Sequence, residues 1–284
     1  MNTESDRKTE GPIRIDLDSV LRARLGSRKV PGWIVRRLEK LICQDELNAL
    51  LAYAYPNRGS LFCRSVIEHL GIKVNISGAG NLPADGRAIF VSNHPLGGLD
   101  GMALIDFIAT RYGCEPLFVV NDLLMAVEPL AEVFLPVNKH GGQSRSALRG
   151  IDEALASDRP VIIFPAGLCS RRQKGKVVDL EWKKMFVQKA VEFKRDIVPL
   201  FFDAENSSSF YRWANIRKRM GIKLNVEMAL LPGEIFKARG KTFTVNVAPA
   251  VAWSSLPRDA RQGALLIRES VYKMKNNHYE PKDN

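Results

Sequence analysis

The stretch that begins at Ala88, AIFVSNHPLGGLDGMALIDFI, combines residue types that could carry out proton transfer. An apolar run is followed by His94, a Gly-Gly pair and Asp100, and then by an apolar-periodic segment. A carboxylate that accepts a hydrogen bond from one imidazole nitrogen fixes the tautomer, and it stabilises the imidazolium that forms when the other nitrogen takes a proton. His94 and Asp100 are therefore a candidate general-base pair, and the hydroxyl that they activate would belong to a substrate.

The place of this pair in the chain favours the same interpretation. In an open α/β sheet, reactive groups gather beyond the carboxyl ends of the strands, and His94 directly follows a strand-like run. Pro95 biases His94 toward an extended backbone, and the two glycines permit a tight turn. Purely structural roles stay open, because Asp100 is also a favoured helix N-cap and His94 could be a hydrogen-bonded loop residue.

Strand-like runs and helical patterns alternate along the rest of the chain. The runs are IKVNIS, AIFVS, EPLFVVN, VFLPVN, PVIIFP, IVPLFF and TFTVNV. Helical patterns cover residues 101–112, the stretch SRSALRGIDEALAS, a long segment with Trp182 and Phe186 on one face, and residues 257–275. This alternation predicts an α/β fold, in which helices cover a sheet.

The sequence divides into three predicted parts. Residues 1–30 are polar and are expected to form a loosely ordered lead-in. Residues 31–70 are expected to form an N-terminal helical portion, with one helix over 31–54 that separates apolar from basic residues. Residues 71–284 then form the α/β domain.

Composition limits the partners and the compartment. The chain of 284 residues has a formal charge of +11 and a pI near 9.6, which favours an anionic partner such as an acidic lipid surface, nucleic acid, or an acidic carrier or substrate. The cysteines are widely spaced and lack a C-x-x-C pair, which indicates a reducing compartment without a disulfide framework or zinc site. The N-terminus lacks a secretory h-region and the apolar runs are too short to span a bilayer, so any membrane contact should be peripheral.

The segment SNHPLGGLDG resembles the first motif of the glycerolipid (lysophospholipid) acyltransferase family, in which a His and an Asp form the catalytic pair. Four residues usually separate the pair, whereas five intervene here, as in the hemolysin-like branch that includes enzymes of bacterial ornithine and glycine lipids. The resemblance implies a mixed central sheet flanked by helices, with an N-terminal helical pair. It also implies direct transfer of an acyl chain from acyl carrier protein or acyl-CoA to a lipid hydroxyl.

Later segments are similar to further motifs of this family. VFLPVNKHG lies where the motif that contacts the acceptor is expected, which makes Lys139 a candidate substrate-binding residue. FPAGLCSRR resembles the third motif, with Ala166 in place of the usual Glu. This change disfavours a simple phosphate acceptor and fits an acceptor with a carboxylate, which Arg171 or Arg172 could bind. Backbone N–H groups near Gly167 are candidates for stabilising the thioester oxyanion.

The segment SSFYRWANIRKRMGIK interleaves aromatic and basic residues. This pattern suits a bilayer interface, and it suits nucleic acid or a helix with a core-facing aromatic stripe as well. Because a lipid substrate requires access to a membrane surface, we predict that Phe210, Tyr211 and Trp213 contact the membrane.

The sequence therefore predicts a cytoplasmic O-acyltransferase that is peripheral on the inner face of the cell membrane. The predicted acceptor is a lyso-lipid, most simply an N-acyl amino-acid precursor of the glycine or ornithine type. The alternatives are a lysophosphatidate acyltransferase and a non-enzymatic basic module that binds membrane or nucleic acid. We expect no cofactor beyond the acyl thioester, no metal and no nucleic-acid partner, and the chain lacks the P-loop, dinucleotide, nucleophile-elbow and zincin motifs.

Overall fold

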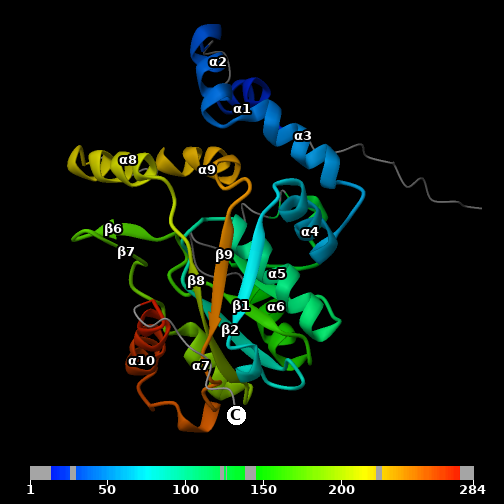
Figure 1. The fold of residues 1–284 in the computed structure, drawn as a ribbon, viewed down its shortest axis with the longest axis vertical. Helices are drawn as coiled ribbons and strands as arrows, with labels where there is room; N and C mark the ends of the chain where they lie inside the picture. The colour runs from blue at the N-terminus through cyan, green and yellow to red at the C-terminus, as the bar shows by residue number, and fades with distance from the viewer. Residues whose placement is uncertain are drawn as a thin grey trace, which may run out of the picture.

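Figure 1 shows the fold, which is described from a computed structural model of the chain. The structure describes residues 14–25, 30–121, 125, 127–137, 145–221 and 226–275. Lys139 lies outside these residues.

A seven-stranded sheet in the order β1-β9-β8-β2-β5-β3-β4 forms the centre of the molecule. Its strands are β1 (Lys73–Ser77), β2 (Ala88–Ser92), β3 (Leu117–Asn121), β4 (Phe134–Val137), β5 (Val161–Ile163), β8 (Asp196–Asp203) and β9 (Thr242–Val247). Strands β8, β2, β5, β3 and β4 run parallel, whereas β9 is antiparallel to β8 and pairs with β1 in parallel. The sheet is therefore mixed, as predicted, and the carboxyl ends of β5, β2 and β8 lie side by side.

Strand β2 is buried on both faces because helices cover both sides of the sheet. Phe90 packs into one core cluster with α4 (Gly59–His69) and α5 (Leu99–Tyr112). Ile89 and Val91 pack into a second cluster, whose helices are α6 (Arg145–Ala156), α7 (Met185–Glu192) and α10 (Ala260–Lys273). Alternate residues of a strand point to opposite faces, which explains why this run is apolar throughout.

Several elements lie beyond one end of the sheet, where Figure 1 shows α8 (Ser208–Arg219), α9 (Leu231–Lys237) and the N-terminal helices. The N-terminal helices are α1 (Leu17–Leu25), α2 (Gly32–Leu41) and α3 (Gln44–Ala54). A small antiparallel hairpin, β6 (Arg171–Gln173) and β7 (Lys176–Val178), projects from the sheet at its side. Short 3-10 helices cover Ala79–Asn81, Glu128–Leu130, Val226–Leu230 and Trp253–Ser255.

The N-terminal part differs from the prediction in three ways. Helix α1 lies within the predicted loose lead-in, and the segment is held where the N–H of Leu17 donates to Gln44 Oε1 over 2.8 Å. The single helix predicted over 31–54 is two helices, because Cys43 has a φ of +53°, a value incompatible with a continuous helix. Helix α4 packs against α5, so the predicted boundary at residue 70 separates segments that lie in one core.

No helix within the described ranges is long and apolar enough to cross a membrane.

Candidate active site

His94 is positioned by the end of β2. Asn93 directly follows β2, and its side-chain amide forms two hydrogen bonds with the backbone of Phe202 on β8. Its Oδ1 atom accepts the Phe202 N–H at 2.7 Å, and its Nδ2 atom donates to the Phe202 carbonyl at 2.9 Å. This side chain extends the β2–β8 ladder by one residue. His94 therefore leaves the sheet from a fixed point.

His94 and Asp100 are in contact, as the catalytic interpretation requires. The Nδ1 atom of His94 lies 2.9 Å from Oδ2 of Asp100, whose side chain is fully buried. Asp100 also accepts the N–H groups of Leu96 and Gly101, each at 2.9 Å. A carboxylate that faces only donors is an acceptor, so Nδ1 carries a proton, and in the neutral imidazole Nε2 has the free lone pair of a base.

The turn between the two residues depends on a glycine. Gly97 has a φ of +78°, and a Cβ atom at this position would lie 2.7 Å from Cδ1 of Leu231. Both the backbone conformation and the approach of α9 therefore require a residue without a side chain. Gly98 carries no such requirement, since its φ of −173° is ordinary extended backbone.

An aromatic residue that sequence reasoning missed holds the imidazole from one face. The ring of Phe164, directly after β5, stacks on His94 with 4.1 Å between centroids and 19° between planes. Phe118 meets Phe164 edge-on at 5.3 Å. The His94 side chain, 15% exposed, is thus fixed by a carboxylate and an aromatic face while part of it stays accessible.

Asp179 is a second carboxylate at this site, and sequence reasoning missed it too. Its Oδ1 atom accepts the backbone N–H of His94 at 3.2 Å and the hydroxyl of Ser170 at 2.5 Å, and Oδ2 accepts the indole N–H of Trp182 at 2.9 Å. Burial raises the pKa of Asp179, although the hydrogen bonds from Ser170 and Trp182 act in the opposite direction. Ser170 N–H also donates to the His94 carbonyl at 2.7 Å, so both backbone groups of His94 are held. No signal in the sequence pointed to this contact, because the strand that precedes Asp179, β7, was not among the predicted runs.

The loop of the predicted third motif lies next to His94, but its residues differ in accessibility. Gly167 is exposed with a φ of +64°, and its N–H donates to the Phe164 carbonyl at 3.0 Å. This N–H closes a turn, so Gly167 itself cannot donate to an oxyanion in this conformation.

Arg171 is a correction to the predicted acceptor site. Its guanidinium is buried and lies 2.9 Å from Oε1 of Glu227, and it also donates to the Cys169 carbonyl at 2.7 Å. Arg217 also forms an ion pair with Glu227, and its Nε atom lies 2.8 Å from Oε2 of Glu227. A buried charge needs an oppositely charged partner. Arg171 therefore binds Glu227 and connects β6 to the segment before α9, and it is not free to bind an acceptor.

Arg172 points the other way and remains accessible. Its side chain is 37% exposed, its guanidinium lies 5.1 Å from the centre of the Tyr211 ring, and it has a long ion pair of 3.8 Å with Glu205. Of the predicted substrate-binding arginines, Arg172 is the one that could bind an incoming anion.

The predicted membrane contacts are wrong for two of the three aromatic residues. Phe210 and Tyr211 are buried in a small core cluster with Cys169 and Val177. The Tyr211 hydroxyl accepts the N–H of Asn206 at 3.0 Å, and burial raises the pKa of Tyr211. Trp213 on the same helix is 57% exposed, so it remains available for a surface contact.

Within the part of the chain that the structure describes, His, Cys, Asp and Glu side chains form no group of three or more that could hold a metal ion.

A His–Asp pair at the carboxyl end of a central strand is suited to general-base chemistry, and comparison with known proteins gives the class to which the chain belongs. Residues 20–281 match the acyltransferase family model, and the chain belongs to this family. The predicted resemblance and the predicted acyltransferase activity are thereby confirmed. The alternative of a non-enzymatic binding module is wrong.

Two relatives match nearly the whole chain. A protein of Phocaeicola vulgatus named lyso-glycine lipid O-acyltransferase is 42% identical over 264 residues, which are 92% of this chain and 95% of that protein. A protein of the same name from Bacteroides thetaiotaomicron is 41% identical over 264 residues, with 92% and 97% covered. The crystal structure of the 1-acyl-sn-glycerophosphate acyltransferase PlsC from Thermotoga maritima is similar over 92% of this chain and 89% of that chain, with a TM-score of 0.48 and 18% identity.

Proposed function

We propose that the protein transfers a fatty acyl chain from a thioester to the hydroxyl of a lyso-glycine lipid, an N-acylated glycine whose chain carries the hydroxyl. The identity of 42% and 41% to two proteins named for this reaction supports the acceptor. Ala166, in place of the glutamate that the resemblance associates with phosphate acceptors, supports the same choice.

His94 acts as the general base in this proposal. Nε2 takes the proton of the acceptor hydroxyl while the oxygen attacks the thioester carbonyl carbon, and collapse of the tetrahedral intermediate breaks the carbon–sulfur bond. The thiolate leaves and is later protonated. Asp100 keeps the proton on Nδ1 and stabilises the imidazolium. General-base catalysis of this kind typically contributes about 10²–10⁴-fold in rate.

The remaining roles follow from charge and exposure. Arg172 binds the glycine carboxylate, since its guanidinium is accessible and its ion pair with Glu205 is long. Lys139 is proposed as a second contact for acceptor or carrier. The donor is acyl carrier protein or acyl-CoA, both anionic and suited to a chain with a charge of +11. The enzyme works in the cytoplasm, at the inner face of the membrane, and Trp213 contributes to the surface contact.

The experiment is a transfer assay with purified protein, acyl carrier protein or CoA thioesters as donors, and lyso-glycine lipid or lysophosphatidate as acceptor. We expect acylation of the lyso-glycine lipid, and a loss of about 10²–10⁴-fold in His94→Ala. His69→Ala is the matched control, because His69 contacts Tyr53 at the far end of α4 and should leave the rate unchanged. A higher kcat/KM with lysophosphatidate would overturn the acceptor, and full activity of His94→Ala would overturn the base.

A further inference from the structure

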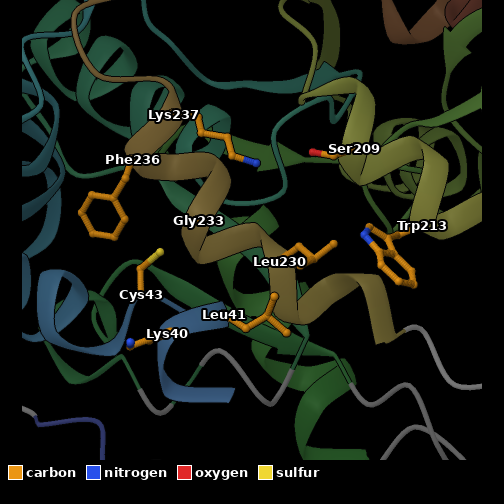
Figure 2. A pocket seen from close by; sticks show the side chains of 9 residues that line it. All are labelled: Lys40, Leu41, Cys43, Ser209, Trp213, Leu230, Gly233, Phe236 and Lys237. Carbon is orange, nitrogen blue, oxygen red and sulfur yellow. The ribbon is translucent and has the colours of Figure 1, made fainter. Parts of the chain in front are cut away.

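A surface cavity of about 420 Å³ lies between the N-terminal helices and the α8–α9 segment (Figure 2). Its walls come from the α2–α3 junction, from α8 and from the segment of α9. The lining residues are Lys40, Leu41, Cys43, Ser209, Trp213, Leu230, Gly233, Phe236 and Lys237. The missing side chain of Gly233 leaves part of this space empty. A Cβ atom at Gly233 would lie 3.6 Å from the sulfur of Cys43, which is an ordinary van der Waals distance.

The chemistry of this lining matches an amphiphile with a negative head. Leu41, Trp213 and Leu230 supply apolar walls from α2, from α8 and from the residue before α9 (Figure 2), and Leu41 is 43% exposed despite its apolar side chain. Lys40 and Lys237 are cations of the same lining, and Lys40 is exposed. Apolar walls with cations beside them fit an alkyl chain that ends in an anionic group.

Further exposed apolar side chains continue this surface outward on the same two helices. Trp33 on α2 is 64% exposed, and Ile216 with Met220 extends the Trp213 stripe at helical spacing along and just beyond α8. Basic residues share these helices: Arg36, Arg37, Arg212, Lys218 and Arg219. The cavity thus opens among groups that suit the boundary of an anionic bilayer.

Two consecutive residues join the cavity to the turn between His94 and Asp100. Leu230 lines the cavity, and the next residue, Leu231, packs against Gly97 between His94 and Asp100. The start of α8 is tied to the same turn, because Asn206 Nδ2 donates to the Pro95 carbonyl at 3.0 Å. A chain in the cavity would therefore lie across α9 from the reacting groups.

We infer that the cavity holds the hydrocarbon chain of the lyso-lipid acceptor. This inference rests on the proposed function and names the subsite that draws the acceptor from the bilayer. In this proposal the donor chain arrives on a carrier, whereas the acceptor resides in the membrane. When the head group of the acceptor reaches His94, the hydrocarbon chain of the acceptor needs an apolar binding site. Each methylene group that is buried in such a site strengthens binding by about fourfold.

The test uses acceptors of increasing chain length with the full-length protein. Gly233→Leu fills the cavity without backbone strain, and Gly150→Leu on α6, where a Cβ would meet no atom within 4 Å, is the matched control. We expect Gly233→Leu to raise KM at least about tenfold for a long-chain acceptor, with kcat, the KM of a short-chain acceptor and the KM of the donor unchanged. An unchanged long-chain KM would overturn the inference, and a raised donor KM would assign the cavity to the donor chain instead.

A binding measurement separates this inference from the proposed function. N-acylglycines that lack the hydroxyl cannot be acylated, and their dissociation constants can be measured below their micellar concentration. We expect affinity to rise with chain length in wild type and to be nearly independent of it in Gly233→Leu and in Trp213→Ala, whose exposed residue can be removed without disturbing the core. Chain-length dependence without transfer would refute the function alone; transfer without chain-length dependence would refute the cavity assignment alone.

Discussion

At the scale of single residues, the state of His94 follows from its neighbours. Asp100 faces three N–H donors, so its oxygens accept and the neutral imidazole holds one tautomer. Phe164 prevents the ring from turning toward the core, because a stacked ring at 4.1 Å leaves no room for rotation. Orientation of a base before the substrate arrives removes part of the entropic cost of proton transfer.

Asp100→Asn tests this arrangement. Whichever way the amide turns, its NH₂ group faces a backbone donor, the N–H of Leu96 or of Gly101. We expect the transfer rate to fall at least about 100-fold and the free energy of unfolding to fall by about 1–3 kcal/mol. Initial rates and denaturant unfolding measure these effects. Asp106→Asn on the same helix, which disturbs a surface contact with Arg64, is the control and should keep the wild-type rate.

Contacts within the site could be predicted from the sequence where the two partners are close in the chain. His94 and Asp100 lie within one turn, so their contact could be predicted, whereas Asp179 reaches His94 only because the β6–β7 hairpin folds back beside the sheet. Arg171 and Arg172 could not be told apart from sequence. They alternate along a short strand that was not among the predicted runs, so one side chain enters the core and the other faces outward.

At the scale of elements, periodicity identified the sheet and its central strands but failed at the N-terminal helices. The strand runs were predicted because buried parallel strands are continuously apolar. The break at Cys43 carries no glycine or proline, so nothing in residues 31–54 signals the junction. In α8, helical spacing decides the outcome: Phe210 and Tyr211 face the core while Trp213 faces outward, although all three were predicted to face the membrane.

Glu234 connects two of these elements. It lies on α9 and accepts both the N–H of Ser207, at 2.6 Å, and its hydroxyl, at 2.7 Å, with Lys237 as a further donor at 2.7 Å. Burial by itself raises the pKa of Glu234, but the bonds from Lys237 and Ser207 outweigh burial and hold this pKa below the ordinary 4.5. The ionised carboxylate therefore stabilises the fold above pH 4.5, and this contribution is lost as the pH falls through the lowered value.

Glu234→Gln should lower the free energy of unfolding at neutral pH by about 1–3 kcal/mol. The difference from wild type should shrink as the pH falls below 4.5, because the wild-type carboxyl group then takes up a proton too. Denaturant unfolding at a series of pH values measures the gap. The control is Glu192→Gln, which affects an exposed ion pair with Lys189. A difference in unfolding free energy between Glu234→Gln and wild type that stays constant below pH 4.5 would contradict this account.

At the scale of the whole molecule, charge and exposed apolar surface act together. The net charge of +11 favours binding to an anionic surface, and helices α2 and α8, which carry Trp33 and Trp213, lie at the same end of the molecule (Figure 1). The carboxyl ends of the central strands, where His94 lies, are at this end as well. A membrane bound there would bring the lipid to the side of the sheet that carries the chemistry.

Binding to vesicles should therefore need both features. We expect the protein to co-sediment with anionic vesicles, and less with neutral ones or at high salt. Trp33→Ala combined with Trp213→Ala should weaken binding several-fold, because both rings are exposed and both would be buried at the interface. Leu265→Ala, which removes an exposed apolar side chain from α10, is the control. Equal weakening by this control would exclude docking through α2 and α8.

The hydrogen bond between Asp179 and Tyr272 links α10 to the residue that holds the backbone of His94. The Asp179 N–H donates to the Tyr272 hydroxyl at 2.7 Å, so α10 holds the backbone of the residue whose carboxylate accepts the His94 N–H. A nascent chain that has left the ribosome only as far as β9 already carries the base and its partner, but it lacks this hydrogen bond. Without α10, Asp179 would lose this contact, and the backbone of His94 would lose part of its support.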